Sequence, residues 1–306
     1  MPDIILHHYP RSPFAHKVRG VLGYKKLSWR SAEVPMFPPR PELSLLTGAY
    51  RKIPVMQIGA DIFCDSNMIL RALDALHPAP TLYPAGDTLS YPVSHWFEPR
   101  LFSWFSAVRF RTREDLGELA FASEFRADRA PFMLPMIDIA KNRDNMPTMA
   151  AHVRAFAAWL DGLLQAQPFL GGGAPSHADF SAWHPIWWLG AASARTDLLS
   201  EFSALWAWEA RMSAFGEGAS APISEGGALA VAKSAQPGFT LPHRPGPGDP
   251  VPGARVIVTP DDYGCDPVAG DLVSLGLEHV SIHREAPETG DIVQHFPRWG
   301  YRVTVA

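Results

Sequence analysis

The sequence contains few cysteines, few charged residues and no long apolar run. Cys64 and Cys265 are the only cysteines in 306 residues, too few for a disulfide framework, which fits a reducing cytoplasm. Charged residues make up 19% and the net charge is −4, so nothing predicts nucleic-acid binding. No stretch approaches the roughly 18 uninterrupted apolar residues of a membrane span. Asp3 precedes the first apolar run, so we expect no signal peptide.

The remaining composition is that of a globular protein. Hydrophobic residues make up 47% of a chain whose length suggests about two domains with a sizeable core. Ten tryptophans, gathered in the middle of the sequence, favour a bulky helical core there.

The first twenty residues read as a strand followed at once by a helix. Residues 4–6 are a short apolar run, and Ser12 and Pro13 suit the N-cap and first position of a helix. Phe14 and Val18 then follow at helical spacing. A hydroxyl at a helix N-terminus lies where anions are stabilised, which suits a site that holds a thiolate.

The next sixty residues continue this alternation. Residues 27–34 predict a second strand, whereas four prolines exclude a regular element over 35–41. Residues 53–58 and 62–64 flank a turn and predict a hairpin, and 66–76 carry the apolar face of a helix. This order is compatible with a thioredoxin-like domain.

Three short blocks resemble the cytosolic glutathione transferases. Ser-Pro-Phe-Ala at 12–15 is similar to the opening of the serine-type and omega-like groups, where Ser or Cys precedes Pro-Phe. Residues 51–58 resemble the strand that carries a cis proline, and 63–70 the acidic-Ser pair before the next helix. A fourth element is the box of Ser176 and Asp179, which resembles the one before the family's core helix.

The C-terminal part departs from the family pattern. Residues 216–253 are rich in Gly, Pro, Ala and Ser. Short strands follow at 255–259, 272–275, 279–284, 291–296 and 301–305. We therefore expect a thioredoxin-like glutathione-binding domain over 1–78, an all-helical domain over 88–215, a linker over 216–253 and a small all-β module over 254–306.

The resemblance implies that glutathione is the co-substrate and that its sulfur attacks a small hydrophobic electrophile. A free thiol has a pKa near 8.5, and lowering it by about two units needs close to 3 kcal/mol. The Ser12 hydroxyl and the helix N-terminus could supply that stabilisation. Tyr9 is the alternative donor, and Ser12 could also be no more than a helix cap. The absence of cysteine at position 12 argues against a mixed disulfide with the enzyme.

The same resemblance implies that five neighbouring residues form the glutathione-binding site. Ile53 would present its backbone to the cysteinyl part, beside a cis Pro54. Asp65 and Ser66 would bind the γ-glutamyl end, and Lys52 the glycine carboxylate. Plain helix capping is the alternative role for the acidic-Ser pair, and a solvated surface position the alternative for the lysine.

Side chains of the helical domain would line the electrophile pocket together with one from the first helix. The predicted lining residues are Phe14, Phe102, Phe105, Ser106 and Arg109. The alternative is that the aromatic residues are core and the arginine belongs to a solvated face. No cluster of histidine and cysteine has metal-ligand spacing, so we expect no metal.

Three functions stay open from the sequence. The first is a glutathione transferase-like enzyme, which the resemblance implies to be a homodimer. The second is a non-catalytic scaffold of the same fold, in which residues 254–306 bind a protein partner. The third is a specialised glutathione-dependent lyase or isomerase.

Overall fold

The computed structural model describes residues 3–84, 89–109, 127–128, 145–190 and 193–306, and these form two compact units. The first unit consists of Met1–Pro78 together with Glu217–Ala306, and the second of Ala79–Gly216. The C-terminal residues thus fold with the N-terminal ones, although more than a hundred residues separate them in sequence.

The first part of unit 1 has the predicted thioredoxin-like order. Strands β1, β2, β3 and β4 span Ile4–His8, Ser28–Glu33, Val55–Ile58 and Asp61–Cys64. Helices α1, α2 and α3 span Pro13–Tyr24, Pro41–Thr47 and Ser66–Leu76. Helix α2 is an addition to the prediction, and it begins with a proline at its first position, where no donor is needed.

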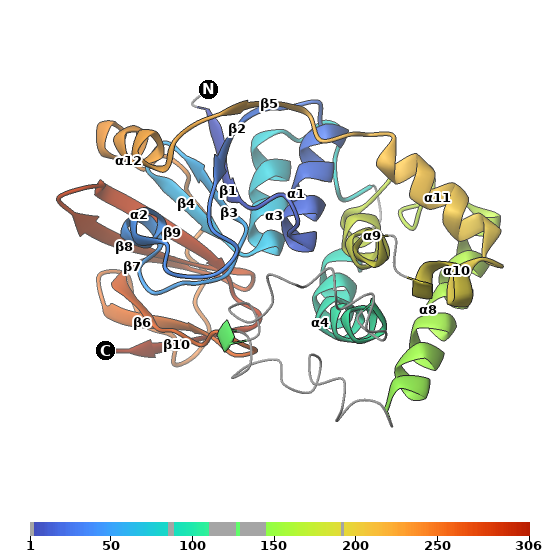
Figure 1. Cartoon of the computed structure of the whole chain (residues 1–306). Helices are drawn as coiled ribbons and strands as arrows, with labels where there is room; N and C mark the ends of the chain where they lie inside the picture. Colours follow the sequence, from blue (N-terminus) through green and yellow to red (C-terminus); the bar gives the residue numbers. More distant parts are fainter. Residues whose placement is uncertain (1–2, 85–88, 110–126, 129–144, 191–192) are drawn as a thin grey trace. The chain divides into compact units, whose positions relative to one another are not determined.

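The C-terminal residues extend the same sheet (Figure 1). Strands β6 to β10 span Arg255–Pro260, Val268–Leu275, His279–Ala286, Gly290–Pro297 and Tyr301–Val305, which confirms the five predicted strands. Strand β9 pairs in parallel with β4. The sheet follows the order β10-β6-β7-β8-β9-β4-β3-β1-β2-β5, in which β5 is Ala219–Pro222.

The Gly/Pro-rich segment contains two regular elements. Strand β5, Ala219–Pro222, pairs in parallel with β2, and helix α12, Glu225–Ser234, buries Ala228 and Ala232 against the sheet. Gly218 allows this approach, because a Cβ there would lie 2.5 Å from the Leu27 carbonyl oxygen and its φ is +74°.

One hydrophobic core unites the N-terminal and C-terminal parts of unit 1. Leu46 of α2 and Ile62 of β4 belong to the same buried cluster as Val258, Ile282 and Phe296. Burying these apolar side chains together is the main force that holds the added strands to the rest of the unit.

A network of buried hydrogen bonds supports the pairing of β4 with β9. The Asp61 carboxylate lies 3.0 Å from His295 Nε2, and His295 Nδ1 lies 2.8 Å from the Ser281 hydroxyl. All three side chains are buried, and the second Asp61 oxygen accepts the backbone N–H groups of Gly238 and Phe239. These hydrogen bonds therefore connect three C-terminal segments to the N-terminal strand β4.

Unit 2 is helical over the residues that the structure describes. Helices α4, α8, α9, α10 and α11 span Ser90–Arg109, Met146–Ala166, His177–Leu189, Ser193–Leu199 and Ser203–Ser213. The predicted capping box before α9 is confirmed, with Ser176 at the N-cap and Asp179 three residues on. Among the described residues, no helix is both long enough and apolar enough to cross a membrane.

Candidate functional site

Three predicted site residues meet at one edge of the sheet. Val55 begins β3 and lies opposite His7 in β1 and opposite Cys64, the last residue of β4. Because both pairs are antiparallel, the end of β1, the start of β3 and the end of β4 share an edge. The residues brought there are Ser12, Pro54 and Asp65.

Ser12 caps helix α1, and its hydroxyl accepts the Ala15 backbone N–H at 3.2 Å. Its own backbone N–H donates to the Tyr9 carbonyl at 3.0 Å, so the two candidate hydroxyl residues belong to one turn. Ser12 is buried, whereas Tyr9 and Phe14 are half-buried. Because the serine hydroxyl accepts the Ala15 N–H, it can still donate its own proton, and it lies at the positive end of the α1 dipole.

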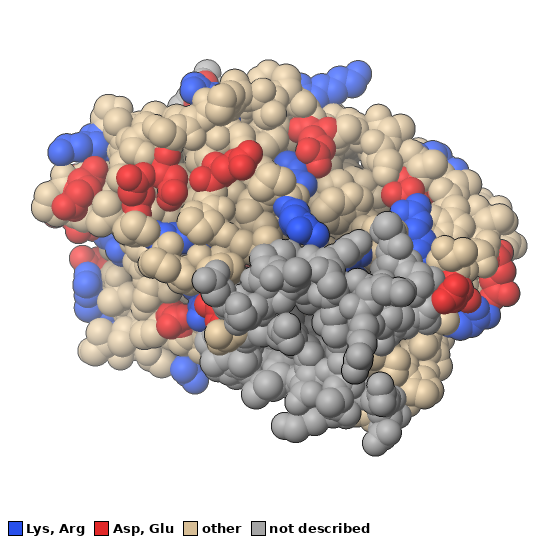
Figure 2. Space-filling view, viewed as in Figure 1, with Lys and Arg blue, Asp and Glu red and all other residues tan. Residues whose placement is uncertain are grey.

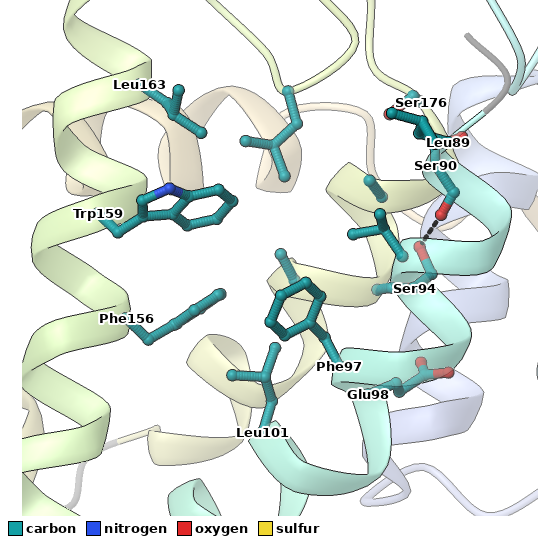
Figure 3. Close-up of a pocket in the computed structure, with 15 residues that line it drawn as sticks. Leu89, Ser90, Ser94, Phe97, Glu98, Leu101, Phe156, Trp159, Leu163 and Ser176 are labelled. Carbon is teal, nitrogen blue, oxygen red and sulfur yellow. Dashed lines mark hydrogen bonds between the residues drawn. The ribbon is translucent and has the colours of Figure 1, made fainter.

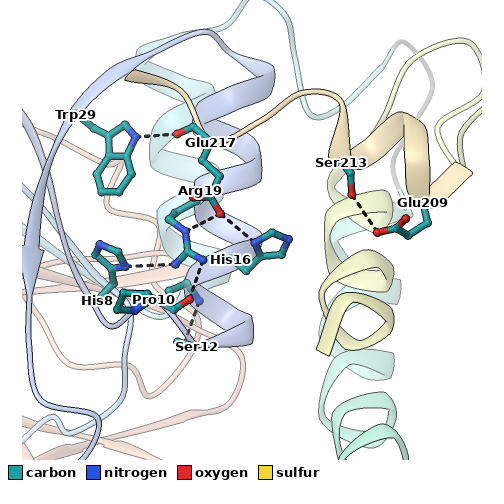
Figure 4. A network of polar contacts seen from close by, with 10 residues as sticks. His8, Pro10, Ser12, His16, Arg19, Trp29, Glu209, Ser213 and Glu217 are labelled. Carbon is teal, nitrogen blue, oxygen red and sulfur yellow. Dashed lines mark hydrogen bonds and ion pairs between the residues drawn. The ribbon is translucent and has the colours of Figure 1, made fainter. Parts of the chain in front are cut away.

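A guanidinium holds the turn that precedes Ser12 (Figure 4). Arg19 of α1 donates to Glu217 Oε1 at 2.9 Å, to the Pro10 carbonyl at 3.0 Å and to His8 Nδ1 at 3.2 Å. One planar group makes all three contacts. It therefore holds together the end of β1, the turn at Pro10 and Glu217, the first residue of the C-terminal part of unit 1. Glu217 is thereby a positioning residue for the Ser12 turn.

The ionisation states in this network follow from its contacts. Burial, followed by the charge of Arg19, lowers the pKa of His8 to about 4, and a neutral ring can donate from Nε2 to Ser31. Burial alone would raise the pKa of Glu217, but the hydrogen bond from His16 and the charge of Arg19 outweigh it and lower that pKa to about 2. The carboxylate therefore stays ionised at neutral pH.

The segment before β3 carries the predicted cis proline. The Ile53–Pro54 peptide bond is cis, which confirms that expectation. Arg40 donates to the Arg51 carbonyl at 2.7 Å and supports this segment from the start of α2. Lys52 forms an ion pair with Asp262, a C-terminal residue that the sequence did not associate with the site.

Asp65 and Ser66 open helix α3 as predicted. Asp65 is the N-cap with φ +80°, and its Oδ1 accepts the Asn67 backbone N–H at 2.9 Å. Lys17 of α1 is fully buried and donates to Asn67 Oδ1 at 2.7 Å, and its Nζ lies 3.5 Å from the Ser66 hydroxyl. The start of α3 thus combines a carboxylate with the N-terminus of a helix and a nearby ammonium, which suits an amino-acid ligand end.

The last strand also reaches this place. The Tyr301 hydroxyl donates to Asp65 Oδ2 at 3.1 Å and lies 3.2 Å from the Tyr50 hydroxyl. Burial raises the pKa of both tyrosines well above 10.0, so both remain phenols at neutral pH. No local signal in the sequence predicts these contacts, because they join segments that are distant in the chain.

The residues predicted on α4 lie inside unit 2. Phe105 is fully buried with its ring 6.1 Å from that of Phe156, and the Arg109 guanidinium donates to the Leu189 carbonyl. Phe102 lies half-buried with its ring 6.4 Å from that of His184, and Ser106 is buried. These contacts are those of the helical core, whereas the lining of an electrophile pocket by these residues stays a prediction.

An apolar cavity of about 190 Å³ lies between α4, α8 and α9 of unit 2. Figure 3 shows Phe97 from α4 facing Phe156 and Trp159 from α8. Its polar lining residues include Ser94 and Glu98, and the Glu98 carboxylate lies 2.9 Å from His184 Nε2. The walls could hold an aromatic group, but the predicted α4 lining residues are not part of this cavity.

The surface charge is mixed on one face of the molecule, and the described residues contain no cluster of metal ligands. On the face shown in Figure 2, acidic and basic side chains lie interspersed among many uncharged residues. Within the ranges that the structure describes, no group of three histidine, cysteine or acidic side chains could hold a metal ion.

Comparison with known proteins is consistent with this architecture. The family described as "Glutathione S-transferase, N-terminal domain" matches residues 6–81, and "Glutathione S-transferase, C-terminal domain" matches 140–211. Among curated proteins, none matches this sequence significantly.

Solved structures extend the likeness to the C-terminal strands. A GST-like protein from Pseudomonas syringae is 31% identical over 100% of both chains, with a TM-score of 0.81. Glutathione S-transferase III in its apo form (18% identity, 69% of this chain, 92% of that chain) and glutathione transferase F2 from Populus trichocarpa (16%, 69%, 93%) each give a TM-score of 0.52 and show the fold alone. The chain therefore belongs to the glutathione transferase family.

Proposed function

We propose that this protein is a glutathione transferase in which the Ser12 hydroxyl lowers the pKa of the glutathione thiol for attack on a small hydrophobic electrophile. The observation that carries the proposal is the common sheet edge that holds Ser12 at the start of α1, cis Pro54 before β3 and Asp65 at the start of α3. We further propose that it acts in the cytoplasm as a homodimer, as its family resemblance implies.

Each part of the tripeptide has a matching group at this edge. The backbone of Ile53 would pair with the cysteinyl part, and this pairing would direct the sulfur toward the serine turn. The Asp65 carboxylate suits the γ-glutamyl ammonium, and the Ser66 hydroxyl with the first N–H groups of α3 suits its carboxylate. Lys52 lies on the segment that would face the glycine end.

The chemistry needs only modest stabilisation of the thiolate. A hydrogen bond from a hydroxyl to a charged sulfur and the N-terminus of α1 each contribute about 1 to 2 kcal/mol, which together shift the thiol pKa by about two units. Arg19 and Glu217 support this by holding the turn between Pro10 and Ser12. The thiolate then attacks the electrophile, and the leaving group departs with the electron pair of the broken bond.

The test is the ultraviolet absorbance of the thiolate in the glutathione complex. We expect Ser12→Ala to remove most of this absorbance while glutathione affinity is largely kept, and Tyr9→Phe to leave it unchanged. Equal absorbance in Ser12→Ala and the unmodified protein would contradict the role of Ser12, and loss in Tyr9→Phe would transfer that role to Tyr9.

A further inference from the structure

The ammonium of Lys52 is already engaged by C-terminal residues. It forms an ion pair with the Asp262 carboxylate, and it lies 4.8 Å from the ring centre of Tyr263 and 5.7 Å from that of Tyr301. Only 11% of the lysine side chain is exposed. A carboxylate and two aromatic faces therefore already satisfy this cation from within the chain.

The loop between β6 and β7 packs against the segment that contains Lys52, in addition to forming the ion pair with it. Gly264 has φ +58°, and a Cβ there would lie 2.7 Å from Arg51 Cδ, so only glycine permits this approach. At the end of β6 that leads into this loop, Tyr301 pairs opposite Pro260, and its hydroxyl lies 3.2 Å from that of Tyr50. The position of the Asp262 carboxylate beside Lys52 is thus set by the sheet.

This arrangement changes what the site can accept at its glycine end. The terminal carboxylate of glutathione would compete with Asp262 for one ammonium, or would lie next to a carboxylate of like charge. A ligand whose glycyl end carries an amide has no negative charge there, so it neither competes with Asp262 for the ammonium nor is repelled by that carboxylate. It can instead donate its amide N–H to the aspartate.

We propose that Asp262 is a specificity-determining residue, which biases the glutathione site toward γ-glutamyl thiols whose glycyl carboxylate is absent or capped as an amide. The inference rests on the proposed function, because it takes Lys52 as the group beside the glycine end. The C-terminal strands thereby acquire a role in choosing the thiol co-substrate.

The experiment is a calorimetric titration of the full chain with two thiols, reduced glutathione and its glycyl carboxamide. We expect the unmodified protein to bind the amide about fivefold more tightly than glutathione, because this ratio corresponds to the interaction free energy of a half-exposed ion pair. In Asp262→Asn, glutathione affinity is expected to rise about fivefold while amide affinity changes less than about twofold. Asp262 lies on an exposed loop, so this variant keeps the fold.

Asp261→Asn is the matched control, because it removes the same charge from the neighbouring exposed residue. We expect it to keep the preference of the unmodified protein for the amide. Binding of both thiols with the same preference in Asp262→Asn as in the unmodified protein would overturn the inference alone. Absence of binding for both thiols in every variant would overturn the proposed function and the inference together.

Discussion

The Tyr301 hydroxyl donates a 3.1 Å hydrogen bond to Asp65 Oδ2, joining residues that lie 236 positions apart in the chain. Asp65 is the N-cap of α3 and the residue proposed to bind the γ-glutamyl ammonium. The last strand of the chain is therefore built into the site that the first domain provides. An extension that looks like a separate module in sequence therefore contacts a residue of the proposed glutathione site.

Replacing Tyr301 by Phe tests this relationship. The variant keeps the ring near Lys52 but loses the donor to Asp65, and a hydrogen bond to a charged group contributes about 1.5 kcal/mol or more. We expect the dissociation constant for glutathione to rise about tenfold in a calorimetric titration.

Tyr50→Phe provides the matched control for that variant. It removes the other hydroxyl of the pair and leaves the bond from Tyr301 to Asp65 in place. We expect lower stability with an affinity within about threefold of the unmodified protein. A similar loss of affinity in both variants would show that general packing, and not the bond to Asp65, is responsible.

Stability should fall when the pH drops below 6.5. Burial lowers the pKa of His7, His8 and His279 from 6.5 to about 4, so the unfolded chain binds more protons than the folded chain between these values. The stabilisation is complete above pH 6.5 and is lost as the pH falls to about 4. We expect the thermal unfolding midpoint to decrease steadily across this range, and a constant midpoint would contradict the assigned neutral states.

Protonation of Glu217 should produce a second loss of stability at lower pH. Its pKa falls from 4.5 to about 2 in the folded chain, because its contacts with His16 and Arg19 outweigh burial. Its stabilisation is present above pH 4.5 and is lost as the pH falls toward 2. In urea unfolding experiments, Glu217→Gln should lower stability at neutral pH and weaken the pH dependence below 4.5. An unchanged profile would show that the Arg19 network contributes little.

Asp179 should dominate the stability of unit 2. Its buried carboxylate accepts hydrogen bonds from Leu170 N, Gly171 N, Ser176 N and Oγ, and Trp208 Nε1. Asp179→Ala leaves these donors without an acceptor, so we expect a loss of about 3 kcal/mol or more in urea unfolding. Ser176→Ala, which removes one donor to this carboxylate and the side-chain cap of α9, is expected to cost about 1 kcal/mol. Equal losses would contradict the central role of the carboxylate.

The two cysteines should differ strongly in reactivity. Cys64 is buried, and burial raises its pKa to about 12, whereas Cys265 is exposed. A chromogenic disulfide reagent should therefore modify one thiol per chain in the folded protein and two in denaturant. Cys265→Ser should abolish the reaction of the folded protein, and persistent reaction would show that Cys64 is accessible.

The local signals in the sequence predicted much of this fold. The N-caps of α1, α3 and α9 and the alternation around the hairpin at Gly59 are encoded within a few residues, as are the five C-terminal strands. The resemblance then placed Ser12, Pro54 and Asp65 at one site, and the sheet registers place them at one edge.

The remaining features depend on contacts that a local pattern does not carry. The composition around Gly218 predicted a linker, yet close backbone approach to Leu27 lets β5 join the sheet and Ala228 of α12 pack on it. The pairing of β9 with β4 and the contacts of Tyr301 and Asp262 arise only when distant segments meet. Helical spacing on α4 left open whether Phe105 lines a pocket or belongs to the core, and Phe105 packs inside unit 2.

The most direct test of the account is a calorimetric titration of the full chain with reduced glutathione at neutral pH. The proposed function predicts saturable binding at one site per chain, because the sheet edge from Ser12 to Asp65 offers a group for each part of the tripeptide. Absence of binding up to millimolar glutathione would contradict it and would favour the non-catalytic scaffold, with residues 254–306 as the segment that binds a protein partner.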